Sequence, residues 1–469
     1  MSIADRTPVA DVAVIGAGPA GTTVAARLAQ LGYRVEMVDR GRARRTHTCE
    51  ILAAPTLDLL AMTGAERSVL QAGFPAAEAM TVAWEAPRVV RAMPRGSLLV
   101  DRHRFDALLL DRALELGVTV TGGNAVRRRR LGSSWEIALD GDRAPVCARF
   151  VVDASGRRSS LRHSRPDALL GVTGRWNVAL DRPTVVTVDE GWVWAAPGPA
   201  PCDGVPWCEV TVFVDPTAWR VLGADPVTRY VRLVEAAGIV SPAARLTGGL
   251  TARDATSALA TEVCGCDWLA VGDTALALDP LSSSGVQRAV QSALTAAVVI
   301  HTAMTRPADA ALALDHYRHG LARAAEHHAD WTGESYAAVA AVRSTAFWTT
   351  RATTRRTDGS SDASLGRRAS RLVPSPEAVV RRSPLVRFVE VSQVVGDSVR
   401  LAPALEHPGV DGAVAYVAGT PVVPLLAPMN GVATMGELVG AWAGTMPAAT
   451  AVELAHWLFR RGVIEEAGV

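Results

Sequence analysis

The stretch VAVIGAGPAGTTVAARL, residues 12–28, decides the fold of this chain. Its first four residues form a short apolar strand, and Gly16, Gly18 and Gly21 follow where a helix over Gly18–Leu31 opens. In such a turn the first glycine permits the tight bend, the second lets backbone approach a pyrophosphate, and the third lets helix and strand pack closely. The free amides at the helix N-terminus then face the anion. The stretch therefore predicts a dinucleotide-binding turn.

The residues after this helix complete a βαβ unit. Arg34–Val38 is expected to be the second strand. Asp39 ends it, at a place where a carboxylate can accept hydrogen bonds from an adenosine ribose. Arg40 follows directly, so we include both residues among the predicted cofactor contacts.

Two later segments separate FAD from NAD, which the glycine pattern alone does not do. DASGRR, residues 153–158, follows a buried strand, and GDTALALDPLSSSG, residues 272–285, follows another and leads into a long alanine-rich helix. Asp273, on a tight Gly-Asp turn, is suited to bind ribityl hydroxyls. The helix that begins at Gly285 would point its positive end at the flavin ring, where the reduced anion carries its charge. Together the two segments imply FAD.

Composition narrows the classes of function. The formal net charge of +1 gives no reason to expect a nucleic acid or an anionic lipid as a partner. The most apolar helical stretch, around residues 293–300, is far shorter than the roughly 20 residues that span a bilayer. Six cysteines without zinc spacing predict neither a disulfide framework nor a metal site. An N-terminus without the pattern of a signal peptide predicts a cytoplasmic enzyme.

The 469 residues predict more than one domain. We expect a discontinuous Rossmann-like FAD-binding domain with an inserted antiparallel sheet, because WNVAL, TVVTV, GWVWA and CEVTVFV are short alternating runs separated by turn residues. A polar linker dotted with arginines and a small C-terminal domain follow. The expected boundaries are 1–172 with 252–345 for the FAD-binding domain, 173–251 with 76–98 for the substrate sheet, 346–384 for the linker and 385–469 for the C-terminal domain.

Capping residues predict the ends of two further helices. Asp225 before a proline, with Gly238 at the far end, brackets a helix that closes the inserted sheet. Thr434 and Glu437 have the spacing of a capping box in the C-terminal domain.

The segments GAGPAG, DRHRFDALL, DASGRRS, WVWAAP and GDTALALDPLSSSG together resemble flavoproteins of the p-hydroxybenzoate hydroxylase fold. The resemblance covers roughly residues 10–345. It is to the branch shared by flavin-dependent halogenases, geranylgeranyl reductases and monooxygenases acting on protein-bound tryptophan. It implies an α/β fold, and the C-terminal segment resembles the winged-helix-like tail of some relatives, which either docks a peptide or carrier-borne substrate or pads the fold.

The same resemblance assigns roles around the flavin. It implies that Arg102 lies on the FAD phosphates, Asp273 on the ribityl chain, and Pro280 with Ser282–Val286 along the isoalloxazine. The predicted cofactor contacts are Gly16, Gly18, Gly21, Asp39, Arg40, Arg102, Asp153, Gly272, Asp273, Pro280, Ser283, Ser284, Gly285 and Val286.

The tryptophans of WVWAAP raise the question of halogenation. In flavin-dependent halogenases the family pattern is WxWxIP together with a lysine, and here Trp192, Trp194 and Pro197 match while Ala196 replaces isoleucine. This sequence contains no lysine at all, and arginine is a poor substitute because its guanidinium stays protonated. Trp192 and Trp194 point to the same side of a strand. They either wall the passage between flavin and substrate or pack in the core of the inserted sheet.

The chain further resembles flavin monooxygenases that hydroxylate a tryptophan of a partner protein during maturation of tryptophylquinone amine dehydrogenases and lysine oxidases. Their early loop carries GES before LPP, where this sequence has CEILAAP, residues 49–55. Glu50 in that loop, or nearby His47, is suited to remove the ring proton after hydroxylation, as a general base must. Structural roles for both residues stay open.

We therefore predict an FAD-dependent monooxygenase that uses O2, through a flavin hydroperoxide, to hydroxylate an electron-rich aromatic. The expected substrate is tryptophan or another indole, as a small molecule or within a peptide or on a carrier. The alternatives are a halogenase without the lysine, an isoprenoid-type flavin reductase, and a flavin-binding partner without turnover. Only one dinucleotide glycine motif is visible, so the electrons come from a transient encounter with reduced nicotinamide or from a separate flavin reductase.

Overall fold

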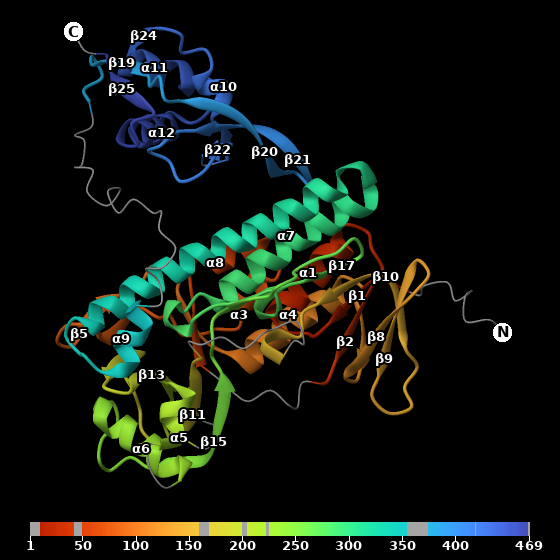
Figure 1. Ribbon diagram of the computed structural model, residues 1–469, viewed down its shortest axis with the longest axis vertical. Helices are drawn as coiled ribbons and strands as arrows, with labels where there is room; N and C mark the ends of the chain where they lie inside the picture. The colour runs from red at the N-terminus through yellow and green to blue at the C-terminus, as the bar shows by residue number, and fades with distance from the viewer. Residues whose placement is uncertain are drawn as a thin grey trace. The chain divides into compact units, whose positions relative to one another are not determined.

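The computed structural model describes residues 10–41, 49–158, 168–198, 204–221, 225–353, 374–417 and 419–467 (Figure 1). These residues form two compact units. The first contains Met1–Arg306 with Tyr317–Thr357, and the second contains Pro307–His316 with Asp358–Val469.

A seven-stranded sheet forms the core of the first unit. Five of its strands, β7, β2, β1, β10 and β17, run parallel, and β9 and β8 extend one edge with antiparallel pairing. The central strands are nearly continuous apolar runs because helices and loops cover both of their faces. The strands are β1 (Ala10–Ile15), β2 (Val35–Asp39), β7 (Thr119–Gly122), β8 (Ala125–Leu131), β9 (Ser134–Leu139), β10 (Val146–Asp153) and β17 (Trp268–Ala270).

The register brings the carboxyl ends of three parallel strands together. Ile15 pairs with Asp153, and Asp153 pairs with Ala270. Helix α1 (Pro19–Gln30) starts directly after β1, and α7 (Gly285–Thr305) packs beside it. The predicted helix over residues 18–31 is therefore present, with each end displaced by one residue. Both segments predicted to bind the flavin leave the sheet at this same edge.

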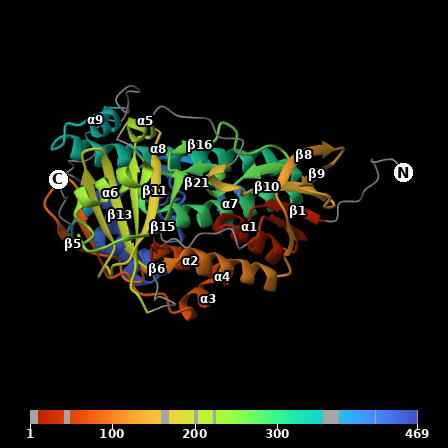
Figure 2. The same ribbon diagram turned by 90° about the horizontal axis from the view of Figure 1, so that it is seen from below.

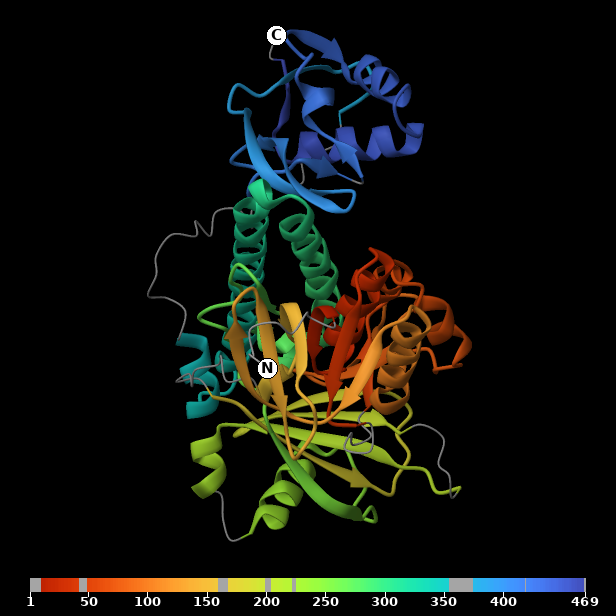
Figure 3. The ribbon, with the colours of Figure 1, turned by 90° about the vertical axis from the view of Figure 1, so that its right-hand side faces the viewer.

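A second seven-stranded sheet belongs to the same unit. Its order is β15-β11-β14-β13-β12-β4-β5. Figure 3 shows its strands β11 to β15 in yellow and green beside red and orange strands of the first sheet. All neighbours pair antiparallel except β4, which runs parallel to β12. A hairpin would force an antiparallel pair, but β4 enters from the 76–98 segment through a long connection. The strands are β4 (Ala79–Ala83), β5 (Val89–Ala92), β11 (Leu170–Trp176), β12 (Thr184–Val188), β13 (Gly191–Pro197), β14 (Cys208–Val214) and β15 (Leu246–Asp254).

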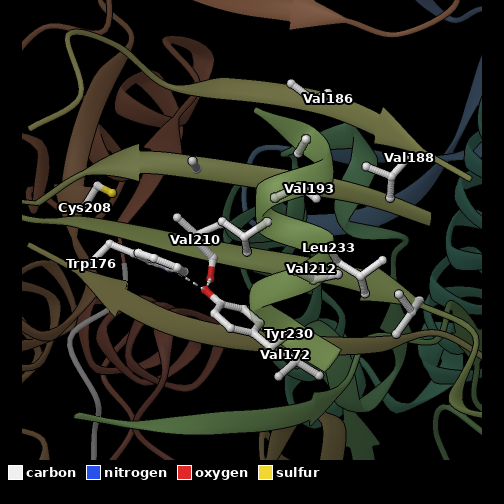
Figure 4. Close-up of a cluster of buried hydrophobic side chains, with 14 of the residues drawn as sticks. Val172, Trp176, Val186, Val188, Val193, Cys208, Val210, Val212, Tyr230 and Leu233 are labelled. Atoms are coloured by element: carbon white, nitrogen blue, oxygen red, sulfur yellow. Dashed lines mark hydrogen bonds between the residues drawn. The ribbon is translucent and has the colours of Figure 1, made fainter. Parts of the chain in front are cut away.

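Helix α6 (Pro226–Ala237) covers one face of this second sheet (Figure 2). Asp225 caps it by accepting hydrogen bonds from two amides of the first turn, and Gly238 ends it in the left-handed conformation, as the sequence predicted. Figure 4 shows valines of four strands packed around Tyr230 of this helix. The Tyr230 hydroxyl donates to the Val210 carbonyl at 2.7 Å and accepts from the Trp176 indole at 3.1 Å.

The second unit has its own core. A three-stranded sheet, in the order β24-β19-β25, packs with α11 (Met435–Ala443) and α12 (Ala448–Arg460) around Trp442. The predicted capping box is present at the start of α11. A long hairpin of β20 (Arg387–Val395) and β21 (Ser398–Glu406) completes the unit. The sheet strands are β19 (Val379–Arg382), β24 (Val432–Thr434) and β25 (Ile464–Glu466).

In the part of the chain that the structure describes, no helix is long and apolar enough to cross a membrane. Among the same residues no cluster of histidine, cysteine or carboxylate side chains could hold a metal ion.

The Tyr230 hydroxyl provides a test of how the second sheet is held. Replacing Tyr230 with phenylalanine leaves the Trp176 indole and the Val210 carbonyl without this buried partner. We expect the free energy of unfolding of the first unit to fall by about 1–3 kcal/mol. Urea unfolding followed by circular dichroism measures it. The control variant Tyr33→Phe lies in the same unit and removes a hydroxyl that pairs with His301 at a less buried position, so it should lower the free energy of unfolding less. Equal effects of the two variants would contradict this account of the sheet.

Candidate cofactor and substrate site

The glycine turn leaves open space in front of the N-terminus of α1. Gly16 has a φ of 104°, and a Cβ there would lie 2.5 Å from the Ala154 carbonyl oxygen. A Cβ at Gly21 would overlap the Gly16 carbonyl oxygen. At Gly18, by contrast, a Cβ would have no heavy atom within 4 Å beyond its chain neighbours. The first and third glycines therefore allow close packing, whereas the second faces space that a pyrophosphate can fill.

Asp39 lies at the end of β2, beside this turn. Its carboxylate accepts hydrogen bonds from the Ala17 amide at 3.3 Å and from the Gly41 amide at 3.0 Å. These backbone donors fix the carboxylate where the sequence predicts the adenosine ribose. The adjacent Arg40 is exposed.

Asp153 is buried, and its carboxylate already has partners within the protein. Arg128 on β8 donates to it at 2.7 Å, and Ser155 donates through its amide at 3.0 Å and its hydroxyl at 2.6 Å. These contacts hold the loop that follows β10 against the glycine turn. The structure thus places Asp153 beside the predicted cofactor residues, but with its carboxylate directed to Arg128 and Ser155.

Arg157 joins the two segments from which FAD was inferred. Its Nε donates to Asp273 at 3.0 Å, and its other nitrogens donate to the carbonyl oxygens of Thr256 at 2.9 Å and Leu278 at 2.6 Å. Asp273 remains about one third exposed, so a carboxylate oxygen stays accessible to ribityl hydroxyls. Sequence reasoning quoted Arg157 within DASGRR but gave it no role.

The predicted isoalloxazine residues lie together in the loop before α7 and at the start of that helix. We call residues 279–286 the flavin loop. Asp279 caps a short turn over residues 280–282 by accepting from the Leu281 amide at 3.0 Å. Ser283 adopts the left-handed conformation with a φ of 48°, and the hydroxyls of Ser282 and Ser284 are 2.8 Å apart. Helix α7 then begins at Gly285. Pro280, Ser283, Ser284, Gly285 and Val286 therefore lie close together along the chain; Ser283 and Gly285 are exposed, whereas Val286 is buried.

A buried hydrogen-bond chain connects this loop to the second sheet. The Trp192 indole donates to the Tyr336 hydroxyl at 3.3 Å, and that hydroxyl donates to Asp279 Oδ2 at 2.9 Å. Tyr336 and His328 both lie on α8 (Ala310–Ala340), and His328 Nε2 accepts from the Asp279 amide at 2.9 Å. Burial raises the pKa of Asp279 above its usual range.

The two motif tryptophans occupy different environments. Trp192 is buried and stacks on Phe213, with ring centroids 3.9 Å apart, inside a cluster that includes Tyr336 and Trp348. Trp194 is partly exposed and packs against the same cluster, as does Leu281 of the flavin loop. Trp192 therefore lies in the core, while Trp194 and Leu281 are partly buried residues that pack against the same cluster.

Arg102 and Glu50 are brought together. Arg102 starts α4 (Arg102–Glu115), and it donates to Glu50 at 2.9 Å and to Asp106 at 3.1 Å. Glu50 is on β3 (Cys49–Leu52), which pairs antiparallel with β6 (Leu98–Asp101). The ion pair fixes the position of the Glu50 carboxylate. His47 lies outside the described residues.

The residues present fit FAD. Open space at Gly18 is suited to the pyrophosphate, and Asp39 accepts from the Ala17 amide of the turn. Asp273 offers an accessible carboxylate next to Gly272, which packs closely against Ala20 of α1. The loop before α7 then provides a surface for the ring. All of these groups lie at the carboxyl edge of the parallel sheet, where open α/β folds bind their ligands.

Comparisons with known proteins agree with this arrangement. A family model described as FAD binding domain matches residues 9–332. Tryptophan 2-halogenase of Chondromyces crocatus is 26% identical over 375 residues, which cover 72% of this chain and 70% of that protein. The solved structure of the peptidyl tryptophan dihydroxylase QhpG is 25% identical with a TM-score of 0.70, covering 97% of this chain and 99% of that one. The flavin-dependent halogenase CmlS shares the fold, with a TM-score of 0.77 at 17% identity over 99% and 98% of the two chains.

The structure of the turn predicts different effects of alanine at two of its glycines. Gly18→Ala should keep the fold, because the backbone there suits alanine and the Cβ meets no atom. It should weaken FAD binding about tenfold or more, since the methyl group enters the space for the pyrophosphate. Gly21→Ala should, unlike Gly18→Ala, lower the melting temperature of the apoprotein, because its Cβ would overlap the Gly16 carbonyl oxygen. Fluorescence titration with FAD and thermal unfolding measure both effects, and undiminished FAD affinity of the Gly18 variant would refute the assigned pyrophosphate position.

The hydrogen-bond chain predicts a specific cost for one hydroxyl. Tyr336→Phe removes the side-chain donor to the buried Asp279 carboxylate, which should lower the free energy of unfolding by about 1–3 kcal/mol. Tyr33→Phe is the matched control, because the Tyr33 hydroxyl pairs with His301 at a less buried position. Urea unfolding of both variants gives the comparison. A Tyr336 variant no less stable than the Tyr33 variant would argue against the chain as a support of the loop.

Proposed function

Since the chain belongs to the FAD-binding domain family and is an FAD-dependent oxidoreductase, we propose that it hydroxylates an electron-rich aromatic ring. The proposed substrate is tryptophan or another indole, free, within a peptide or on a carrier. One observation carries the choice of hydroxylation over halogenation: a motif of paired tryptophans lies beside the flavin loop in a sequence that has no lysine. The likeness to a peptidyl tryptophan dihydroxylase over nearly the whole chain supports the substrate class.

The absence of lysine matters because of acid-base chemistry. A lysine amine can lose its proton when it is buried, and it can then act as a nucleophile toward an oxidised halogen. An arginine guanidinium stays protonated and is a poor nucleophile. Arg102, which lies beside Glu50 of β3, is bound to that carboxylate and to Asp106. Direct transfer of a hydroxyl group requires no such amine.

The residues of the chain would hold the reactants in place. Gly18 and the start of α1 would bind the pyrophosphate, and Asp273, oriented by Arg157, would bind the ribityl chain. Bound FAD would supply the reduced ring at which oxygen is activated. The flavin loop, capped by Asp279, would fix the position of that ring. The packed indole of Trp192 would keep water away from one side of the site.

The source of electrons is part of the proposal. The single glycine turn is assigned to FAD, so a reduced nicotinamide would bind transiently or a separate flavin reductase would deliver the electrons. Consumption of NADH or NADPH by the purified protein, without a reductase, distinguishes the two routes.

Halogenation of the same class of substrate is the second candidate. The likeness to a tryptophan 2-halogenase and the match of Trp192, Trp194 and Pro197 to the family pattern favour it. It would need another group to carry out the step that the absent lysine performs.

Product mass separates the two reactions. The FAD-loaded protein is supplied with chemically reduced FAD, oxygen and bromide, and with L-tryptophan, indole or a tryptophan-containing peptide. We expect a product heavier than its substrate by one oxygen atom, in equal amount with and without bromide. The Gly18→Ala variant, weak in FAD binding, is the control for reaction in solution. A brominated product would reject hydroxylation in favour of the second candidate.

A further inference from the structure

One face of the second sheet changes from aromatic to acidic along two neighbouring strands. Across β13 and β14, Trp192 pairs with Phe213, Trp194 with Thr211, and Ala196 with Glu209. Since side chains alternate along a strand, these residues share a face. The face lies opposite the valines that pack on α6. We call this face, defined by these six residues, the site face.

Glu209 is a buried carboxyl at the acidic end of the site face. It is only 8% exposed, and the backbone amide of Cys49 donates a hydrogen bond to it. Arg175 lies directly across from it on β11, but the Arg175 guanidinium stacks on Trp207, 4.0 Å from the ring centroid. The position opposite Glu209 thus holds an arginine whose charged group is stacked on an indole.

Strand β3 connects Glu209 with the flavin loop. Cys49, at its start, donates to Glu209, and Leu52, at its end, belongs to the same core cluster as Val286 and Val290 of α7. Val286 is the second residue of α7 and one of the predicted isoalloxazine contacts. At the aromatic end of the site face, Trp194 and Leu281 pack on one cluster. Strand β3 and this cluster therefore link the two ends of the site face to elements that carry predicted isoalloxazine contacts.

We propose that Glu209 is the proton acceptor for an indole bound on the site face, an inference that rests on the proposed function. Its carboxylate accepts a hydrogen bond from the indole N–H and takes that proton as the new C–O bond forms. When aromaticity returns, the ring C–H proton leaves to water and Glu209 gives its proton back to the nitrogen. One ring hydrogen is thereby replaced by hydroxyl. The hydroxyl oxygen comes from O2, the other oxygen leaves as water, and reduced nicotinamide supplies the two electrons through FAD.

Glu209 suits this role better than Glu50, the acid that the sequence suggested. Glu50 is bound to Arg102 at 2.9 Å and is 43% exposed. The Glu50 carboxylate is thus engaged by a guanidinium, whereas a carboxyl group removed from water, such as Glu209, binds a proton more tightly. A general base works best when its pKa lies near the operating pH.

The charges around Glu209 set the pH at which it ionises. Burial raises its pKa from 4.5 to about 8. The Cys49 amide lowers the pKa, the Glu50 carboxylate raises it, and Arg253 and Arg175 lower it. Glu209 therefore loses its proton in the range where a flavin enzyme of this kind would be assayed.

The thiols next to Glu209 do not titrate in that range. Burial raises the pKa of Cys208 to about 12, and burial raises that of Cys49 further still. Any ionisation observed near the pKa of Glu209 is thus assignable to the carboxyl.

Equilibrium binding of indole tests the proposal without turnover. The protein carrying oxidised FAD is titrated with indole and with 1-methylindole, which has no N–H, at pH values on both sides of the Glu209 pKa. Indole should bind about tenfold more tightly above that pKa than one unit below it, because the carboxylate then accepts the N–H. 1-Methylindole should bind independently of pH. Equal pH dependence of the two ligands overturns the proposal.

Variants identify the group that titrates. Glu209→Gln keeps the shape of the side chain and can still accept from the Cys49 amide. It should therefore fold and bind indole, but its indole affinity should not rise with pH. Glu235→Gln, at an exposed position of α6, should keep the rise of indole affinity with pH. A rise that is lost in Glu50→Gln but kept in Glu209→Gln overturns the proposal. Protein that takes up no FAD overturns the proposed function and this inference with it. Protein that takes up FAD but binds no indole overturns this inference.

Stability provides a readout that needs no ligand. Because the folded-state pKa of Glu209 is raised, its protonated form stabilises the fold at low pH, and that contribution is lost as pH rises through about 8. As the pH is raised from below 4.5 to above about 8, the melting temperature of the natural protein should therefore fall relative to that of Glu209→Gln. A constant difference over this range overturns the assignment of Glu209 as the titrating acid.

Discussion

The hydrogen bond between Tyr336 and the buried Asp279 is the contact on which the arrangement of the site depends. A carboxyl group removed from water is costly unless donors surround it, and Asp279 receives them from Tyr336 and the Leu281 amide. The same tyrosine receives the indole N–H of Trp192. One buried polar group thus fixes a loop of the first sheet, a strand of the second and a long helix relative to one another. Trp192 of the tryptophan motif contributes to this support.

Arginine provides every fixed positive charge around the candidate site, because the sequence has no lysine. Arg102, Arg128 and Arg157 each bind a carboxylate that sequence reasoning had proposed as a contact or a base. A guanidinium stays charged at any pH compatible with folding, so each of these pairs fixes the orientation of its carboxylate. Glu209 differs, because the arginine opposite it stacks on Trp207 and burial dominates its ionisation. The site therefore separates carboxylates that hold position from one that can exchange a proton.

Local signals in the sequence predicted the parts of the fold that depend on local rules. The glycine turn, the caps at Asp225 and Thr434, and the α/β class with its FAD-binding fold are confirmed, since each depends on backbone geometry over a few residues. Tyr336, Arg157 and Glu209 were not singled out, because their partners lie far away in the sequence and only the fold brings them together. The parallel entry of β4 escaped prediction for the same reason. The assignments of individual cofactor contacts and of Glu50 and His47 as bases stay predictions.

The central claim is that oxygen activated at the loop before α7 reaches an indole directly. Reaction under isotopically labelled O2 tests it most directly, with FAD-loaded protein, a nicotinamide electron source with a flavin reductase, and the indole substrate that binds best. The account predicts one labelled oxygen atom per hydroxylated product and an unchanged yield in excess bromide. Product oxygen derived from water, or a yield that depends on halide, would contradict it.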